Sequence, residues 1–81
     1  MGGKRTDVAL PDLGDIESAV VVAWLCLPGS LLKEGDDLVE VETEKTTFIV
    51  PAPSNGILTE VRAPAGASVR IGEILGILEA G

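Results

Sequence analysis

Lys45 is the residue of this chain whose surroundings best suit chemistry. It stands between Glu44 and Thr46, in a short polar segment that separates two apolar runs. A free lysine has a pKa of about 10.4, so at neutral pH it is an unreactive ammonium that attacks an activated acyl group only after a modifying enzyme removes its proton. The chemistry open to Lys45 is therefore acylation by another protein. A lysine among charged neighbours is also an ordinary solubility residue, so the choice depends on how the chain presents it.

No other residue pattern points to catalysis. The sequence has no histidine and no tyrosine, so the commonest general acid or base is missing and no Ser/His or Cys/His nucleophile pair can form. The one cysteine, Cys26, lies inside an apolar run, which favours a buried, inert thiol over a reactive one. We therefore expect a protein that is not an enzyme on its own.

The chain contains an internal repeat at an offset of 37 positions. This shift superposes residues of the same class, among them Gly29 on Gly66 and Gly35 on Gly72. Two copies of one unit in a short chain predict a domain with pseudo-two-fold symmetry, because an open solenoid needs about three or more repeats. The same shift moves Lys45 to position 82 (45 + 37), just past the last residue. We therefore expect Lys45 at the end of the domain opposite to the one where both termini meet.

Glycine and proline punctuate short apolar segments throughout the chain, which leaves room for strands and for no long helix. Before Lys45, Val39 and Val41 alternate with Glu40 and Glu42, the pattern of a strand with one face in water. A tight hairpin with Lys45 at or beside its tip follows. Strands are predicted at residues 8–10, 19–27, 31–32, 38–43, 46–50, 57–63, 68–69 and 74–78.

Length, charge and hydropathy restrict the class of protein. The 81 residues make one domain with a thin core. The net charge of −7 argues against a nucleic-acid partner and favours basic protein surfaces. The longest apolar run, residues 19–27, is shorter than the roughly 20 residues of a membrane span. No secretory signal is recognisable and one cysteine cannot form an internal disulfide, so we expect a reducing compartment.

Three stretches, PDLGDIESAVVVAWLCLPGS, KEGDDLVEVETEKTTFIVPAPSNGILTEV and GASVRIGEILGIL, match a known family. From about Val8 onward the sequence resembles the lipoyl domain of the dihydrolipoamide acyltransferase (E2) component of 2-oxoacid dehydrogenase complexes, most like the pyruvate dehydrogenase type. The resemblance implies an N-terminal extension at residues 1–7 and a lipoyl domain at residues 8–81. It also implies an all-β fold, a flattened barrel or sandwich of two four-stranded antiparallel sheets.

In that family the lysine of an Asp-Lys-Ala turn carries lipoic acid in amide linkage. The corresponding turn here reads Glu44-Lys45-Thr46, so the resemblance implies lipoyl attachment to Lys45, with Glu44 and Thr46 as flanking recognition residues. The implied function is a swinging-arm carrier that shuttles acyl groups and reducing equivalents in a 2-oxoacid dehydrogenase complex, with pyruvate as the expected 2-oxoacid.

The resemblance also implies partners and a location. The partners are the 2-oxoacid decarboxylase (E1), dihydrolipoamide dehydrogenase (E3), the E2 catalytic core and a lipoylating enzyme. The location is the bacterial cytoplasm or the mitochondrial matrix. We expect the chain to be one domain of a longer E2 polypeptide.

Three alternatives stay open. A biotin carrier domain shares this fold, but its lysine typically lies between two methionines, and the only methionine here is Met1. A glycine-cleavage H protein is also lipoylated, but that family is longer and contains helices. An unmodified adaptor or structural barrel would make Lys45 incidental.

Two groups of surface residues are expected to bear on partners. Acidic residues precede Lys45 in the sequence and could steer it to basic docking sites: Asp36, Asp37, Glu40, Glu42 and Glu44. Positions that are usually polar or charged in related lipoyl domains are apolar here: Val20, Ala23, Leu27, Leu31 and Ile49. We expect Val20, Leu27 and Leu31 to share one outward face, a patch that would support weak self-association or cover by a partner.

Overall fold

The protein was analysed as a computed structural model that describes residues 4–80, and strands are the only regular elements in that part of the chain. No window of the sequence has a helical stripe, and turn residues interrupt every apolar run, so short strands are what these residues can form. The strands are β1 (Lys4–Ala9), β2 (Ser18–Trp24), β3 (Leu31–Leu32), β4 (Asp37–Glu42), β5 (Thr47–Pro51), β6 (Gly56–Val61), β7 (Ser68–Arg70) and β8 (Ile74–Ala80).

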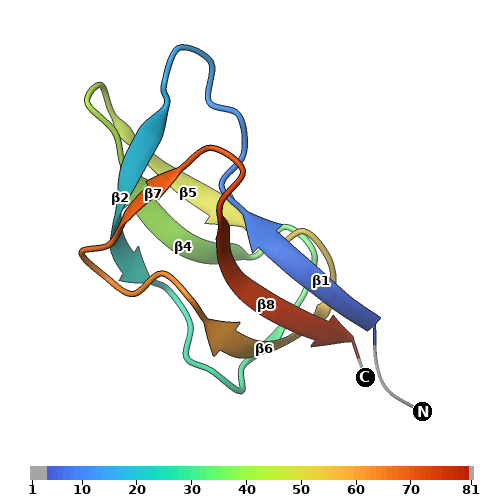
Figure 1. Ribbon diagram of the computed structural model, residues 1–81. Coiled ribbons are helices and arrows are strands. Elements are labelled where there is room, and N and C mark those ends of the chain that lie inside the picture. The colour runs from blue at the N-terminus through green and yellow to red at the C-terminus, as the bar shows by residue number, and fades with distance from the viewer. Residues whose placement is uncertain (1–3, 81) are drawn as a thin grey trace.

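The eight strands form two four-stranded sheets that pack face to face (Figure 1). The first sheet has the order β1-β8-β6-β3 and the second has the order β5-β4-β2-β7. Every pairing is antiparallel. This confirms the predicted fold class, a sandwich of two four-stranded antiparallel sheets.

The strand orders also confirm the predicted internal symmetry, because β1, β8, β6 and β3 hold the places in one sheet that β5, β4, β2 and β7 hold in the other. Backbone hydrogen bonds repeat at the expected offset of 37. The amide of Gly29 donates to the carbonyl of Leu58, and the amide of Gly66 donates to the carbonyl of Val21, each at 2.7 Å. The molecule is therefore related to itself by a pseudo-two-fold axis.

The offset is larger at the sheet edges, where β1 corresponds to β5. The Gly35 amide donates to the Ala52 carbonyl at 2.9 Å, and the Gly72 amide donates to the Leu10 carbonyl at 2.8 Å. Leu10 and Ala52 are 42 positions apart, five more than the offset elsewhere (42 − 37). The path from Leu10 to Val21 is thus five residues longer than the equivalent path from Ala52 to Leu58 (11 − 6), and the difference lies in the longer connection between β1 and β2.

The core lies between the sheets and consists of aliphatic side chains. Leu38, Val39 and Val41 of β4 are buried, as are Leu75 and Leu78 of β8. At one point the packing departs from symmetry, because Trp24 fills space beside Gly76, which has no side chain. Its indole packs on the core, and its Nε1 donates to the carbonyl of Ala63 at 2.7 Å. Trp24 is therefore a partly buried packing residue at the margin of the core.

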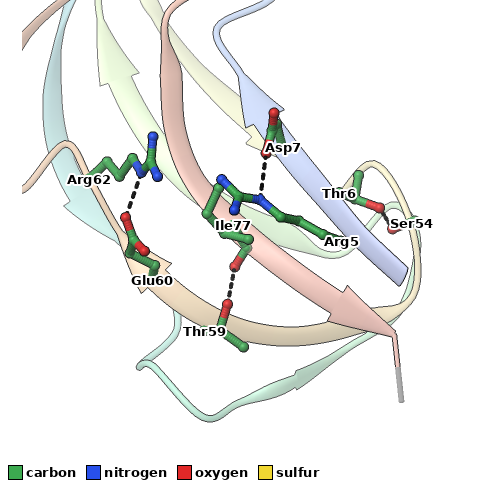
Figure 2. A network of polar contacts seen from close by, with 8 residues as sticks. All are labelled: Arg5, Thr6, Asp7, Ser54, Thr59, Glu60, Arg62 and Ile77. Carbon is green, nitrogen blue, oxygen red and sulfur yellow. Dashed lines mark hydrogen bonds and ion pairs between the residues drawn. The ribbon is translucent and has the colours of Figure 1, made fainter. Parts of the chain in front are cut away.

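Two buried side chains, Ile16 and Ile77, lie outside this core. Ile77 of β8 is cross-strand neighbour to Asp7 of β1 and to Glu60 of β6. These carboxylates form ion pairs with Arg5 and Arg62, which flank Ile77 on the outer face of the first sheet (Figure 2). Arginine stems shield apolar surface while the charged heads stay in water. The outer face of the first sheet is therefore closed by its own charges around Ile77.

Two strand boundaries differ by three or more residues from the sequence-based expectation, and the others differ by two at most. β1 begins at Lys4, four residues before the predicted start at Val8, and pairs with β8 along its whole length. The polar residues at its start have no apolar alternation to reveal a strand, because β1 is an edge strand with outward-facing charges. β2 ends at Trp24 and not at Leu27, since the chain turns toward Pro28. The predicted domain boundary at residue 8 stays a prediction, and β1 crosses it.

Candidate lysine-presentation site

Lys45 lies at the tip of the hairpin that joins β4 to β5. The last strand pair before the tip is Glu42 with Thr47. In Figure 1 this hairpin projects at one end of the molecule, and the two chain ends of the described structure lie together at the other end. There the first residue of β1, Lys4, pairs with the last of β8, Ala80. The expected placement of Lys45 opposite the termini is thus confirmed.

Thr43 holds the turn that presents Lys45. Its hydroxyl oxygen accepts hydrogen bonds from the amide of Lys45 at 3.2 Å and from the amide of Thr46 at 3.0 Å. The same hydroxyl donates to the Thr46 carbonyl at 2.8 Å, and so does the Thr43 amide. A threonine that bonds the backbone two and three residues ahead replaces the Asn-Gly or Asp-Gly chemistry that this hairpin lacks. Sequence reasoning missed Thr43, although its position two residues before the lysine is the available signal.

The three predicted site residues are all exposed, so Glu44 and Thr46 flank an accessible lysine. The Lys45 side chain is 60% exposed, and its Nζ lies 3.9 Å from Oδ2 of Asp15. Asp15 is 93% exposed, so this ion pair is weak and leaves the ammonium free to move. Asp15 comes from the long connection between β1 and β2, and the sequence contains no sign that this loop approaches the hairpin.

A shallow open hollow of about 500 Å³ separates that loop from the hairpin. Carboxylates line it from both sides: Asp15 and Glu17 on the loop, Glu42 and Glu44 on the hairpin. Lys45 lies beside these four acidic residues, so the tip of the hairpin has a negative electrostatic potential. This potential attracts basic groups over a Debye length of about 8 Å at physiological salt. The negative charge around Lys45 favours association with a basic partner.

The predicted acidic residues do not all lie beside the lysine. β4 runs from Asp37 to Glu42, so Asp37 and its neighbour Asp36 are at the far end of the strand from the hairpin. Asp36 serves the opposite turn, where its Oδ2 accepts the amide of Lys33 at 2.8 Å. The expectation that Asp36 and Asp37 steer Lys45 is therefore wrong, while Glu40, Glu42 and Glu44 follow the strand up to it.

The predicted apolar patch is also wrong as a single surface. Val20 points outward from β2 in the second sheet, whereas Leu31 points outward from β3 in the first. Leu27 lies in the connection between those strands and is 76% exposed. Because the outer faces of the two sheets are opposite sides of the sandwich, Val20 and Leu31 cannot share one contact.

Other chemistry finds little support between residues 4 and 80. Within this part of the chain, no three His, Cys, Asp or Glu residues gather as metal ligands. No helix there is long and apolar enough to cross a membrane. Burial raises the pKa of the Cys26 thiol, which makes the reactive thiolate scarcer at neutral pH.

Comparisons with known proteins agree with this geometry. A family model of biotin and lipoyl attachment domains, described as "Biotin-requiring enzyme", matches residues 6–78. The solution structure of the lipoyl domain of the 2-oxoglutarate dehydrogenase complex from Azotobacter vinelandii is similar to this structure, with a TM-score of 0.73. The two sequences are 32% identical, and the match covers 93% of this chain and 96% of that domain.

Two curated relatives illustrate the range of similar sequences. The dihydrolipoyllysine-residue succinyltransferase component of the Buchnera aphidicola (Schizaphis graminum) 2-oxoglutarate dehydrogenase complex is 38% identical over 90% of this chain. The corresponding acetyltransferase component of the Cupriavidus necator pyruvate dehydrogenase complex is 35% identical over 90% of this chain. This chain spans 19% and 13% of the length of these two relatives.

The chain therefore belongs to the family of biotin and lipoyl attachment domains. Within that family it is a lipoyl domain of the kind found in the E2 chains of 2-oxoacid dehydrogenase complexes. Several relatives are succinyltransferase components of 2-oxoglutarate complexes, so the expected pyruvate type is not confirmed.

Proposed function

We propose that this domain carries lipoic acid in amide linkage on Lys45 and passes acyl groups and reducing equivalents between the active sites of a 2-oxoacid dehydrogenase complex. The observation that carries the proposal is the position of Lys45, exposed at the tip of a hydrogen-bonded hairpin opposite the chain ends. A second lysine of the described chain, Lys33, lies in a turn at the other end of β4.

The residues around Lys45 fit the proposed group. Lipoyl attachment requires a lysine whose Nζ can enter another enzyme's active site, and the neighbour of this Nζ is the weakly held Asp15 carboxylate. The Thr43 hydroxyl holds the backbone of the turn, not the lysine side chain. The side chain therefore keeps its freedom while its point of origin is fixed.

The protein's own contribution to the reaction is presentation. The lipoyl dithiolane, when attached, supplies reductive acylation, acyl transfer and reoxidation, for which this chain has no side chains. The hairpin carries the attachment point away from the sandwich, and tethering makes each transfer a reaction at high effective concentration. Glu42 and Glu44 surround that point with negative charge, which speeds the approach of basic active-site entrances.

The proposed complex is of the 2-oxoglutarate type, because several similar sequences, including the one from Buchnera aphidicola, belong to succinyltransferase components. The pyruvate type is the second candidate, favoured by the acetyltransferase relative from Cupriavidus necator. The proposed partners are the E1 decarboxylase, the E3 dihydrolipoamide dehydrogenase, the E2 catalytic core and a lipoylating enzyme. The proposed location is the bacterial cytoplasm or the mitochondrial matrix.

Mass spectrometry tests the proposal in two stages. After expression with a lipoylating enzyme, intact mass should show one lipoyl group, and tandem spectra should place it on Lys45. Incubation with an E1 of each type should then add a succinyl group from 2-oxoglutarate and no acetyl group from pyruvate. A biotinyl adduct, an adduct on Lys33, or no adduct in the presence of an active lipoylating enzyme would refute the attachment. Acetyl transfer alone would select the pyruvate type.

A further inference from the structure

The outer face of the second sheet carries exposed aliphatic side chains between unpaired carboxylates, and this face adjoins the Lys45 hairpin. It is formed by Val20 and Val22 of β2, Glu40 and Glu42 of β4, and Ile49 of β5. We call these five residues the acidic-apolar face. The three strands are neighbours in the sheet, in the order β5-β4-β2, so the side chains form one continuous surface.

Strand register defines how the face is arranged. One row across the sheet joins Val20, Glu42 and Thr47, and Thr47 is two residues after Lys45. The next row joins Glu40 to Ile49, about 7 Å further from the hairpin. A bulge between Val21 and Ala23 leaves Val22 outside the regular pairing and exposed. The apolar groups are therefore in the first two rows below the presented lysine.

The aliphatic groups of this face are open to solvent. Val20, Val22 and Ile49 are each 42–43% exposed, although they lie in the middle of strands and not at loop tips. The outer face of the first sheet is different at its centre, since two arginine–carboxylate ion pairs close it around Ile77 (Figure 2). Clustered exposed aliphatics of this kind mark contact surfaces.

Charge selects the kind of partner. Among residues 4–80, neither Glu40 nor Glu42 has an ion-pair partner, so this face offers two free carboxylates beside its apolar groups. A second copy of this chain would bring the same carboxylates against each other and would add its own net charge of −7. A surface with lysine or arginine around an apolar centre would satisfy both components.

We propose that the acidic-apolar face is the docking surface for a partner protein that uses Lys45 and that presents basic residues around an apolar centre. The proposal rests on the proposed function, because it takes this partner to be the E1 decarboxylase that loads the arm. Three aliphatic side chains make a contact well below the roughly 1,200 Å² of a stable interface, so docking is transient. A carrier that must leave one active site for the next requires such brief contacts.

The test compares variants of the fully lipoylated domain as substrates of the cognate E1. Val20→Ser/Val22→Ser/Ile49→Ser should raise KM about tenfold with little change in kcat, because uniform binding is lost. Glu40→Gln/Glu42→Gln should raise KM about threefold at low salt, an effect that disappears near 0.5 M salt. Matched controls are Leu31→Ser/Ile57→Ser, which removes aliphatic groups from the opposite face, and Glu34→Gln/Glu79→Gln, which changes the net charge equally.

Each result decides the proposal. KM values that are unchanged in both face variants, or raised equally in both controls, would overturn it. Circular dichroism shows whether the variant with three serine substitutions is folded, so that misfolding is distinguished from lost docking. The Glu40→Gln/Glu42→Gln variant, whose side chains keep their shape, tests docking independently. Wild type that is lipoylated but not acylated would contradict the proposed function itself, a result that intact mass distinguishes from a change in KM. A concentration-dependent dimer that the aliphatic variant abolishes would assign the face to a second copy and refute the proposal.

Discussion

The indole of Trp24 occupies the space that a side chain at Gly76 would need. A Cβ built on Gly76 would lie 2.8 Å from Cη2 of Trp24 and 2.8 Å from the carbonyl oxygen of Glu60. The pair is a break in the internal symmetry. Trp24 pairs with Val39 in one sheet, and the equivalent pair in the other sheet is Val61 with Gly76. The large side chain of Trp24 thus occupies space that the absence of a side chain at Gly76 leaves free, whereas their symmetry mates Val61 and Val39 are both valines.

Gly76→Ala is therefore expected to destabilise the domain by about 1–3 kcal/mol, because the Glu60 backbone cannot move away from an added methyl group. Denaturant unfolding provides the measurement. In the Gly76→Ala background, Trp24→Phe should cost less than it does in wild type, since the smaller ring relieves part of the overlap. Additive free energies for the two substitutions would show that Trp24 and Gly76 do not compete for space.

Thr43→Ala should reduce both stability and lipoylation. The substitution removes a hydroxyl that accepts from the amides of Lys45 and Thr46, and such turn bonds contribute about 1 kcal/mol. Thr43→Ser keeps the hydroxyl and should restore the rate of lipoyl incorporation, measured by intact mass. Thr47→Ala, an exposed neighbour in β5, is the matched control. Equal lipoylation of Thr43→Ala and wild type would mean that the turn needs no side-chain support.

Lys45→Ala should carry no lipoyl group and should unfold within about 0.5 kcal/mol of wild type, because an exposed turn residue contributes little to stability. Unfolding curves and intact mass read the two properties separately. A large loss of stability would indicate that the ion pair with Asp15 is structural.

The register of the turn should matter more for lipoylation than the acid beside the lysine. Glu44→Ala is expected to retain partial lipoylation, because Glu44 is exposed and holds no turn hydrogen bond within the described residues. One residue inserted between Thr43 and Glu44 should abolish it, since the Thr43 hydroxyl would no longer reach the two amides and the lysine would be re-aimed. Equal modification of the insertion variant would contradict this prediction.

Cys26 should react slowly with thiol reagents in the folded protein. Burial raises its pKa, so between the unfolded and folded values the folded chain holds a proton that the unfolded chain releases. Cys26 therefore contributes to the free energy of unfolding below the ordinary pKa of a thiol, and this contribution is lost as the pH rises through the raised pKa of the folded state. Labelling rates measured from neutral to alkaline pH, with and without denaturant, test this. Cys26→Ser should remove the contribution of the thiol to the pH dependence of the free energy of unfolding. Equal labelling rates in both states would refute it.

Much of the fold follows from local patterns. The alternation of Val39 and Val41 with Glu40 and Glu42 marks β4 as a strand with one face in water, and Gly35 and Gly72 carry the repeated turn. Both glycines have positive φ values, 91° and 87°, which other residues adopt only under strain. These features are legible because they depend on residues close together in the chain.

What the sequence did not reveal depends on contacts between distant segments. Asp15 lies beside Lys45 only because the connection after β1 folds toward the hairpin, and no local pattern encodes that approach. The outward direction of Val20 and Leu31 could be inferred, but their separation onto opposite faces depends on which sheet each strand joins. Hydropathy reports exposure of a side chain and carries no information about its neighbours across the sheet.

The longer connection between β1 and β2 adds to the difference between the two ends of the domain. The end opposite the Lys45 hairpin holds the two chain ends of the described structure, where Lys4 pairs with Ala80, and not a second hairpin. The longer connection places Asp15 and Glu17 beside the Lys45 hairpin, whereas the shorter connection after β5 places the Ser54 hydroxyl 3.3 Å from the Thr6 hydroxyl of β1. A modifying enzyme that recognises shape and charge therefore meets a different surface at each end of a molecule built from two nearly equal halves.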